Sequence, residues 1–259
     1  RSEQVADLGE VNMADAAALV DFVEWAVRTY PATHYALILS DHGLGWPGGW
    51  SDAAPSGRGD TRIPLAAGLG DKIFLHELDA ALGELRSRTG IEKFDMIGLD
   101  ACLMGQLEVF TALAPHARVA VASQEVEPAL GWAYTSFLTD LTRNPDLSPA
   151  QLGERIVQSY ISEDQRIQDD QARSELLRQG GGMSGMFGLF GSVTPEMLVR
   201  QMSQDGTLAA IDLEAVPELM ATLNQFAYSL QNTSQPQVAR ARAYAQSFTS
   251  IFGSKVPPS

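Results

Sequence analysis

The chain has a single cysteine, no long apolar run and few basic residues, and each shortage excludes a class of protein. One cysteine in 259 residues cannot form an internal disulfide, so none holds the fold together. No apolar stretch approaches the ~20 residues that a membrane-spanning helix needs. Lys and Arg number 18 against 32 Asp and Glu, and the resulting net charge of −14 argues against nucleic-acid binding. Such an acidic chain suits cationic partners or peptides.

The start of the chain lacks an initiator Met and a signal-like segment. It begins at Arg1 in a polar stretch, so we expect residues 1–259 to be a fragment of a longer precursor. The composition, 45% hydrophobic and 19% charged, is typical of globular proteins. We expect a single domain with a substantial core.

Two short apolar runs each end in a residue that could take part in catalysis. The run 34–40 is followed by Asp41-His42-Gly43, and the run 94–100 is followed by Ala101 and Cys102. Such runs are typical of buried parallel strands, and α/β sheets place their chemistry beyond the carboxyl ends of these strands. An imidazole beside a thiol can remove its proton and make the sulfur nucleophilic. The two runs therefore predict cysteine peptidase chemistry, although a lone cysteine is more often a small buried hydrophobe.

Helices and strands alternate along the first half of the chain, which is typical of an α/β fold with a mostly parallel sheet. Asn12 is expected to cap a first helix that ends at Tyr30-Pro31, and residues 43–70 are expected to form a long loop. The expected strands are 35–40, the run ending at Asp100, and 119–123; helices are expected at about 72–88 and at 104–113.

The second half is expected to be mainly helical. Ser148, Pro149 and Gln151 form a helix-start signal, and Thr194-Pro195 forms another. We expect strands at 186–193 and 207–211. The segment 163–185 is expected to be an exposed connection, and 213–259 a helical C-terminal part, with amphipathic helices at 213–231 and 236–251.

The residues around Cys102 resemble a known family. Asp100-Ala-Cys-Leu-Met-Gly105, with His42 upstream, is similar to the caspase signature. The His-Gly and Asp-Ala-Cys pair resembles the clostripain family of caspase-like cysteine peptidases. Further segments of roughly 7–230 look like family segments: Leu8–Met13, Ser123–Pro128, Gly131-Trp132 and Thr207–Asp212. The resemblance implies a caspase-like three-layer sandwich, with helices on both faces of a mostly parallel sheet.

The resemblance also implies roles for individual residues. It implies that Cys102 is the nucleophile, that His42 is the general base and then acid, and that the N–H groups of Gly43 and Cys102 form the oxyanion hole. Asp100 would lie at the floor of the S1 pocket and favour Arg, or less often Lys, at P1. Considered without the resemblance, Asp100 is equally well a strand-end carboxylate that caps the next helix.

Several other charged residues have two interpretations. Glu125 and Glu127 follow a strand at the same expected edge, where they would line the substrate cleft or bind a cation, or would only be solvated. Asp41 would either orient the edge that carries His42 or only be solvated there, and we expect solvation. Arg58 and Arg62 lie in a glycine-rich loop at 51–62 and are either self-cleavage sites or ordinary surface arginines.

No cofactor is required by any pattern in the chain. The Asp residues lack the spacing of a calcium loop, although the resemblance makes a calcium requirement compatible with the sequence. The expected partners are peptides or proteins with Arg or Lys at P1. The resemblance favours a secreted or cell-envelope location, and the oligomeric state is not indicated.

The expected function is endopeptidase activity after Arg or Lys, with self-processing in the loop 51–62. The alternative is a catalytically silent caspase-like module that binds cationic peptides, or a latent zymogen.

Overall fold

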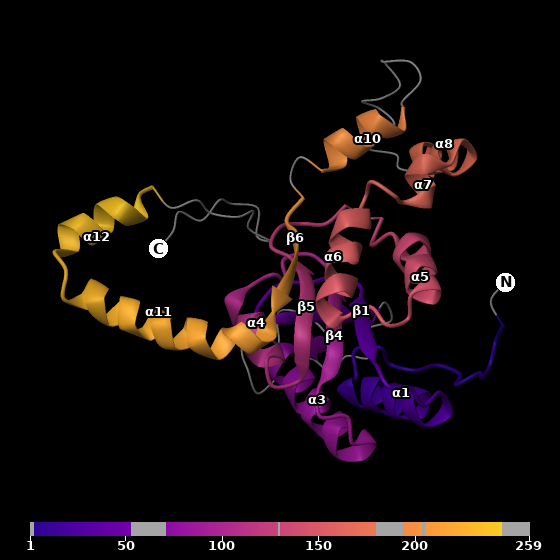
Figure 1. The fold of residues 1–259 in the computed structure, drawn as a ribbon, viewed down its shortest axis with the longest axis horizontal. Helices are drawn as coiled ribbons and strands as arrows, with labels where there is room; N and C mark the ends of the chain where they lie inside the picture. Colours follow the sequence, from indigo (N-terminus) through magenta and orange to yellow (C-terminus); the bar gives the residue numbers. More distant parts are fainter. Residues whose placement is uncertain (1–2, 53–70, 129, 180–193, 204–205, 245–259) are drawn as a thin grey trace.

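A central four-stranded sheet forms the middle of the molecule in the computed structural model (Figure 1). The strands are β1 (Ala36–Ser40), β4 (Phe94–Asp100), β5 (Ala117–Ser123) and β6 (Leu208–Asp212). Their order is β1-β4-β5-β6; the first three are parallel, and β6 runs antiparallel to β5. The structure describes residues 3–52, 71–128, 130–179, 194–203 and 206–244.

Helices cover both faces of this sheet. Side chains alternate along each strand, so Ile97 and Leu99 of β4 face one apolar cluster and Met96 faces another. The first cluster is completed by α1 (Ala16–Thr29), α3 (Leu75–Thr89) and α4 (Leu107–Leu113), and the second by α5 (Tyr134–Arg143) and α6 (Pro149–Ser159). The three-layer α/β arrangement that the sequence predicts is confirmed.

Two helix starts show how local chemistry sets the element bounds. Ser148 caps α6 through its side chain, whose oxygen accepts a hydrogen bond from the Gln151 N–H. The Gln151 side-chain oxygen in turn accepts one from the Ser148 N–H. The capping expectation for this helix is confirmed. For α1 the cap is Asp15, not Asn12 as expected. Asn12 instead hydrogen-bonds the Ala14 N–H and the Asp71 side chain.

The loop expected at 43–70 begins with a strand that the sequence analysis missed. Strand β2 (Gly48–Ser51) pairs antiparallel with β3 (Lys72–Phe74), and α3 therefore begins at Leu75, after the expected start at 72. This small hairpin lies next to the end of β1, because Gly43 forms a bridge with Gly49.

The described part of the expected connection 163–185 is helical. It forms α7 (Gln165–Gln168) and α8 (Asp170–Gln179). Ile167 is fully buried in the second apolar cluster, and the Asp164 carboxylate caps α7. Most residues of 163–176 are exposed, as expected, but Asp164, Ile167 and Arg173 are buried and hold the run against the rest of the fold. The strand expected at 186–193 lies outside the described residues.

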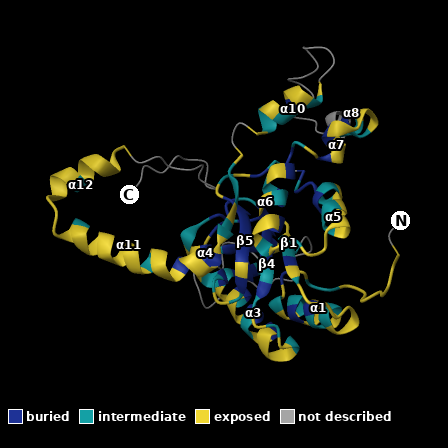
Figure 2. Cartoon of the chain, viewed as in Figure 1, coloured by how far each residue is buried: buried dark blue, intermediate teal, exposed yellow. Residues whose placement is uncertain are grey.

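The C-terminal helices extend away from the sheet (Figure 1). After α10 (Pro195–Met202), which Thr194 caps, and β6, the chain forms a short 3-10 turn (Leu213–Ala215), α11 (Val216–Gln231) and α12 (Gln235–Arg242). Figure 2 shows that α11 and α12 are mostly exposed. None of the helices among the described residues has the length and apolarity that a bilayer span requires.

Candidate active site

The ends of β1 and β4 bring the two predicted reactive residues to one cavity. Ser40 pairs with Asp100, and the Asp41 N–H donates to the Asp100 carbonyl oxygen at 3.3 Å. The segments that follow β1 and β4 then leave the sheet at the same edge. His42, which is exposed, and Cys102, which is partly exposed, both line a cavity of about 800 Å³.

Gly43 lies directly against the backbone of Cys102. A Cβ atom at position 43 would be 2.2 Å from the Cys102 carbonyl oxygen, so only glycine fits this approach. The bonds that flank its bridge to Gly49 run from Trp50 N–H to the His42 oxygen and from Leu44 N–H to the Gly48 oxygen. The Gly43 N–H takes no part in those two bonds.

Asp41 fixes the small hairpin beside His42. Its Oδ2 atom accepts hydrogen bonds from the Ser51 N–H at 2.8 Å and the Ser51 hydroxyl at 3.4 Å. The expectation that Asp41 is only solvated is therefore wrong. The carboxylate connects the end of β1 to the end of β2.

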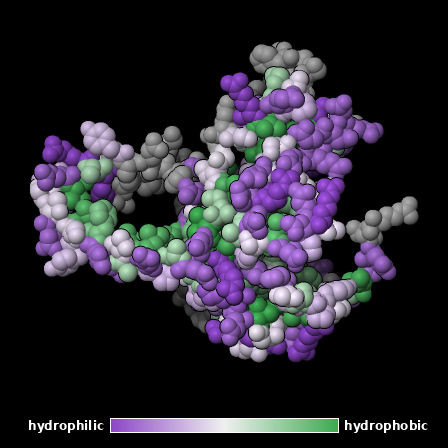
Figure 3. All heavy atoms as spheres, viewed as in Figure 1, coloured by the Kyte–Doolittle hydropathy of each residue, from purple (hydrophilic) through white to green (hydrophobic). Residues whose placement is uncertain are grey.

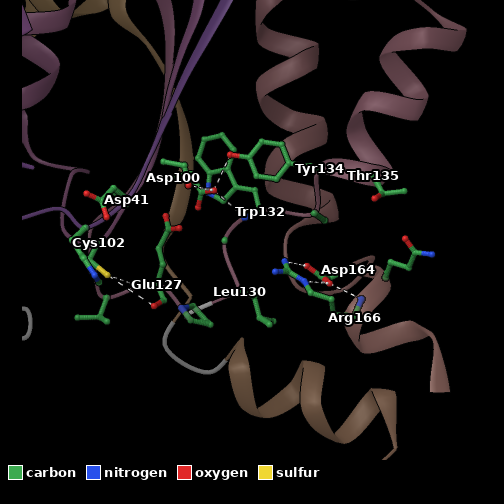
Figure 4. A pocket seen from close by; sticks show the side chains of 18 residues that line it. Asp41, Asp100, Cys102, Glu127, Leu130, Trp132, Tyr134, Thr135, Asp164 and Arg166 are labelled. Carbon is green, nitrogen blue, oxygen red and sulfur yellow. Dashed lines mark hydrogen bonds and ion pairs between the residues drawn. The ribbon is translucent and has the colours of Figure 1, made fainter. Parts of the chain in front are cut away.

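The Cys102 sulfur contacts the main chain of Glu127 (Figure 4). It accepts a hydrogen bond from the Glu127 N–H at 3.3 Å and lies 4.0 Å from the Glu127 carbonyl oxygen. The next residue, Leu103, has a φ of 63°, an unusual conformation for a leucine, and its N–H donates to the Glu125 oxygen. A strained turn therefore presents the thiol beside the segment 125–128.

Asp100 is a buried carboxylate with three hydrogen-bond donors. It is 4% exposed, and its Oδ2 accepts bonds from the Ser40 hydroxyl at 3.1 Å, the Trp132 N–H at 3.3 Å and the Tyr134 hydroxyl at 2.8 Å. None of these donors belongs to α4, so Asp100 does not cap the next helix. Its carboxylate lines the same cavity as Cys102.

Glu127 is a second buried carboxyl group in this cavity, and it lies beside Asp100 in Figure 4. It is 8% exposed, and neither carboxyl oxygen has a hydrogen-bond partner among the described residues. Burial, and then the negative charge of Asp100, raises the pKa of Glu127 to about 9. A carboxyl group in this state holds its proton at neutral pH.

Trp132 and Tyr134 line the cavity, and Tyr160 is buried nearby without lining it. Trp132 packs against the main chain of β4 at Gly98, where a Cβ atom would be 2.8 Å from the ring. Burial and the charge of Asp100 raise the pKa of Tyr134, and burial and the charge of Glu127 raise that of Tyr160. The indole Nε1 of Trp132 and the hydroxyl of Tyr160 are buried without a hydrogen-bond partner among the described residues.

Tyr134, Asp164 and Arg166 also line the cavity, and none of them was predicted as a site residue. Arg166 forms a two-point pair with Asp164, with Nε–Oδ1 at 2.9 Å and NH2–Oδ2 at 2.5 Å. The polar run around 164 was the one available signal, since it places an acid and a base two residues apart. Tyr134 had no signal in the sequence, because α5 itself was not predicted.

The structure does not place three predicted site residues at this cavity: one lies elsewhere, and two are outside the described residues. Glu125 does not line this cavity; its backbone oxygen accepts bonds from the Leu103 N–H and the Ser123 hydroxyl. Arg58 and Arg62 lie outside the described residues, so the self-cleavage prediction stays a prediction. Among the residues that the structure does describe, no group of three or more His, Cys, Asp or Glu side chains is arranged to hold a metal ion.

The other histidines lie in structural contacts. His34 Nδ1 is 3.2 Å from Asp95 at the start of β4, and His116 Nε2 is 2.7 Å from Asp79 of α3. Neither residue lines the cavity, and nor does His76. Of the four histidines, His42 is the one that lines the cavity together with Cys102.

Comparison with known proteins identifies relatives of this arrangement. The sequence profile of the clostripain family of C11 peptidases matches residues 4–177. A solved structure of a secreted C11 cysteine protease from Bacteroides thetaiotaomicron, in complex with an irreversible peptide inhibitor, is 21% identical, with a TM-score of 0.50 over 82% of this chain and 48% of that one.

A second structure from the same organism, a secreted C11 cysteine protease called iotapain, is 17% identical, with a TM-score of 0.51. The alignment covers 83% of this chain and 49% of iotapain, so the chain spans about half the length of these relatives. Both likenesses support the caspase-like fold. A comparison with curated proteins finds no match.

Proposed function

Because this chain belongs to the clostripain family of cysteine proteases, we propose that it is an endopeptidase that cleaves peptide bonds after Arg, and less often after Lys. Cys102 is the nucleophile in this proposal, and His42 is its base. The observation that carries the proposal is that one cavity is lined by Cys102, His42 and two buried carboxyl groups, Asp100 and Glu127.

The reaction begins with transfer of the Cys102 thiol proton to His42, directly or through one water molecule. The thiolate attacks the carbonyl carbon of the scissile bond, and the N–H groups of Gly43 and Cys102 stabilise the oxygen that becomes negative. His42 then returns the proton to the leaving amine. Water, deprotonated by His42, hydrolyses the acyl-enzyme and releases the second product.

The hydrogen bond from the Glu127 N–H supports the nucleophile. An N–H group at 3.3 Å from sulfur stabilises negative charge on it. The same residue therefore contacts the sulfur through its main chain and the P1 side chain through its carboxyl group.

The P1 preference follows from the charges in the cavity. Among the described residues that line it, Arg166 carries the one guanidinium group, and Asp164 pairs with it. Asp100 and Glu127 have no such cationic partner in the described structure. A substrate cation fits here, and Arg, with five N–H donors in a planar group, can satisfy two carboxyl groups better than Lys.

Replacement of the nucleophile is the first test. The variant Cys102→Ala should lose hydrolysis of fluorogenic Arg peptides and keep its thermal unfolding temperature, since alanine fills most of the thiol's space. Turnover equal to that of the wild type would contradict the role of Cys102.

The P1 pocket is tested by comparing substrates. The variant Asp100→Asn should lose kcat/KM for Arg peptides by roughly a hundredfold or more, because it leaves the substrate cation without its charged partner. The same variant should keep whatever low activity it has toward Leu peptides. Equal losses for both substrates would assign Asp100 a structural role.

We also propose self-processing at Arg58 or Arg62, in the glycine-rich loop between the two reactive residues. Mass spectrometry of purified protein should find new chain ends after one of these arginines. The same ends in Cys102→Ala protein would assign the cut to a contaminating protease.

The alternative is a latent or silent module that binds cationic peptides without turnover. The contact of the Cys102 thiol with the Glu127 carbonyl oxygen, at 4.0 Å, favours it, since a thiol that donates to this oxygen is not donating to an imidazole. An arginine-directed covalent probe separates the two: labelling of Cys102 in folded, reduced protein supports the enzyme, and no labelling supports the alternative.

The family membership also leads us to propose a secreted or cell-envelope location. Fractionation of the native host, followed by detection of the protein, tests this location directly.

A further inference from the structure

The two carboxyl groups of the P1 cavity differ in their hydrogen bonds. Asp100 accepts three bonds, from Ser40, Trp132 and Tyr134. Glu127 accepts none at either oxygen among the described residues, although it is as deeply buried. Burial of a charge without donors is costly, whereas a carboxylate with three donors has replaced much of its lost hydration.

The interaction between Asp100 and Glu127 increases the difference in how strongly the two carboxyl groups hold a proton. A negative charge on Asp100 opposes a second one on Glu127, and two interacting carboxyl groups in a cavity share their protons as a pair. Since Asp100 has the donors, the negative charge of the pair lies on Asp100 and the proton on Glu127. The raised pKa of Glu127, about 9, agrees with this assignment.

The surrounding groups do not remove the need for this proton. The titratable and charged groups around Glu127 come from several elements: Asp41 and His42 after β1, Asp100 at the end of β4, Cys102, Tyr134 of α5, Tyr160 directly after α6, Asp164 and Arg166. The two tyrosines stay neutral because burial raises their pKa values. Arg166 is held by Asp164, so its charge is already balanced.

We propose that Glu127 holds a proton while the P1 pocket is empty and releases it to solvent when a guanidinium or ammonium group enters. This inference rests on the proposed function, because it concerns the same pocket. The O–H bond of Glu127 breaks, the proton goes to buffer, and the new carboxylate accepts N–H bonds from the substrate cation. The bound state then has two carboxylates around one cation, with the donors that Glu127 lacked.

The proposal predicts a pH dependence of substrate binding. When binding expels one proton, the apparent affinity rises about tenfold per pH unit below the pKa of the expelling group. The affinity for an Arg ligand should therefore rise about tenfold from pH 6 to pH 7 and again to pH 8. A neutral ligand of the same shape should show no such rise.

The experiment measures proton release on binding to the Cys102→Ala protein, which does not turn over ligand. Titration calorimetry with acetyl-arginine amide at pH 7, in two buffers of different ionisation enthalpy, gives the number of protons released. We expect about one proton for this protein and about none when Glu127→Gln is added. Glutamine has the shape of a protonated glutamate, and equal unfolding temperatures will show that the fold is kept.

Two controls make the result specific. Glu108→Gln removes an exposed carboxylate of α4 that does not line the cavity, and it should release as many protons as the parent. Acetyl-citrulline amide, the uncharged analogue of the ligand, should bind weakly or not at all.

The outcomes distinguish this inference from the proposed function. Binding of the arginine ligand without proton release, or with equal release in Glu127→Gln, overturns the inference and leaves the P1 preference intact. No binding of the arginine ligand, or equal binding of the citrulline ligand, contradicts the P1 preference itself and the inference with it.

Discussion

Glycine at position 43 allows the segments that carry His42 and Cys102 to touch. With any side chain, a Cβ atom would stand 2.2 Å from the Cys102 carbonyl oxygen, and the Met104 side chain would also be within 3 Å of it. The backbone at Gly43 or Cys102 must then move, because a carbonyl oxygen cannot rotate away as the end of a flexible side chain can. The Gly43 and Cys102 N–H groups, which we propose as the oxyanion donors, would then move apart.

The variant Gly43→Ala should therefore lose kcat/KM for Arg peptides by roughly a hundredfold, the scale of a lost oxyanion-hole donor. Steady-state kinetics with a fluorogenic peptide measures the loss. Gly83→Ala in α3 is the matched control, since a Cβ atom there meets only the His116 ring at 3.9 Å. Activity equal to that of the control would show that position 43 tolerates a side chain.

Glu127 also makes the stability of the unliganded protein depend on pH. Its pKa is about 9 in the folded state and near the ordinary 4.5 when unfolded, so between these values the folded state binds more protons. Stability then falls as the pH rises, by up to about 1.4 kcal/mol per pH unit for this one group. Because Glu127 is buried without hydrogen-bond donors, its contribution makes the folded state more stable at low pH than at high pH.

Urea unfolding at pH 6, 7 and 8 should show this decline in the wild-type protein and a flatter profile in Glu127→Gln. The comparison between the two proteins matters, because other groups titrate equally in both. Parallel profiles would mean that Glu127 is already ionised in the folded protein.

At the scale of elements, the hairpin of β2 and β3 supports the histidine side of the site. Asp41 joins the end of β1 to Ser51 of β2, and Trp50 binds the His42 carbonyl oxygen. His42 therefore lies in a segment held on one side by Asp100 and on the other by β2. The hairpin therefore supports the segment that carries His42, the base in the proposed mechanism.

The variant Asp41→Ala should lower kcat by roughly tenfold and leave KM for Arg peptides nearly unchanged, since His42 would lose part of its support. Asp41→Asn, which keeps an acceptor oxygen for the Ser51 N–H, should recover most of the activity. A rise in KM with kcat unchanged would instead place Asp41 in substrate binding.

The elements that could be predicted from the sequence are those with local signals. Apolar runs marked β4 and β5, and the Ser148 and Thr194 caps marked α6 and α10. Strand β2 was missed because Gly48-Gly-Trp-Ser51 has no alternation of its own and depends on β3, about twenty residues later. The proximity of Asp100 and Glu127 was also missed, because it depends on the loop after β5, which brings the two distant residues together.

At the scale of the whole molecule, α11 is the least supported long helix. Only Val216 is buried, whereas Leu219, Leu223 and Phe226 are 51%, 38% and 57% exposed. Figure 3 shows hydrophobic residues along this helix, away from the sheet. An isolated helix of this length is marginal in water, so α11 has little stability of its own.

Amides of residues 220–231 should therefore exchange with deuterium at least about a hundredfold faster than those of Leu78–Leu85 in α3, whose apolar side chains are buried. Exchange followed by mass spectrometry measures both segments in one experiment. Equal protection would mean that another surface covers α11 in solution.

The pairing of Ser40 with Asp100 has a consequence for changes in chain length. His42 and Cys102 each follow this pair by two residues, so one inserted or deleted residue in β1 would displace the imidazole by about 3.3 Å along the sheet and reverse which face its neighbours occupy. Point substitutions leave that spacing intact. Insertions between residues 36 and 42, or between 94 and 102, should therefore destroy peptidase activity even where the altered protein still folds.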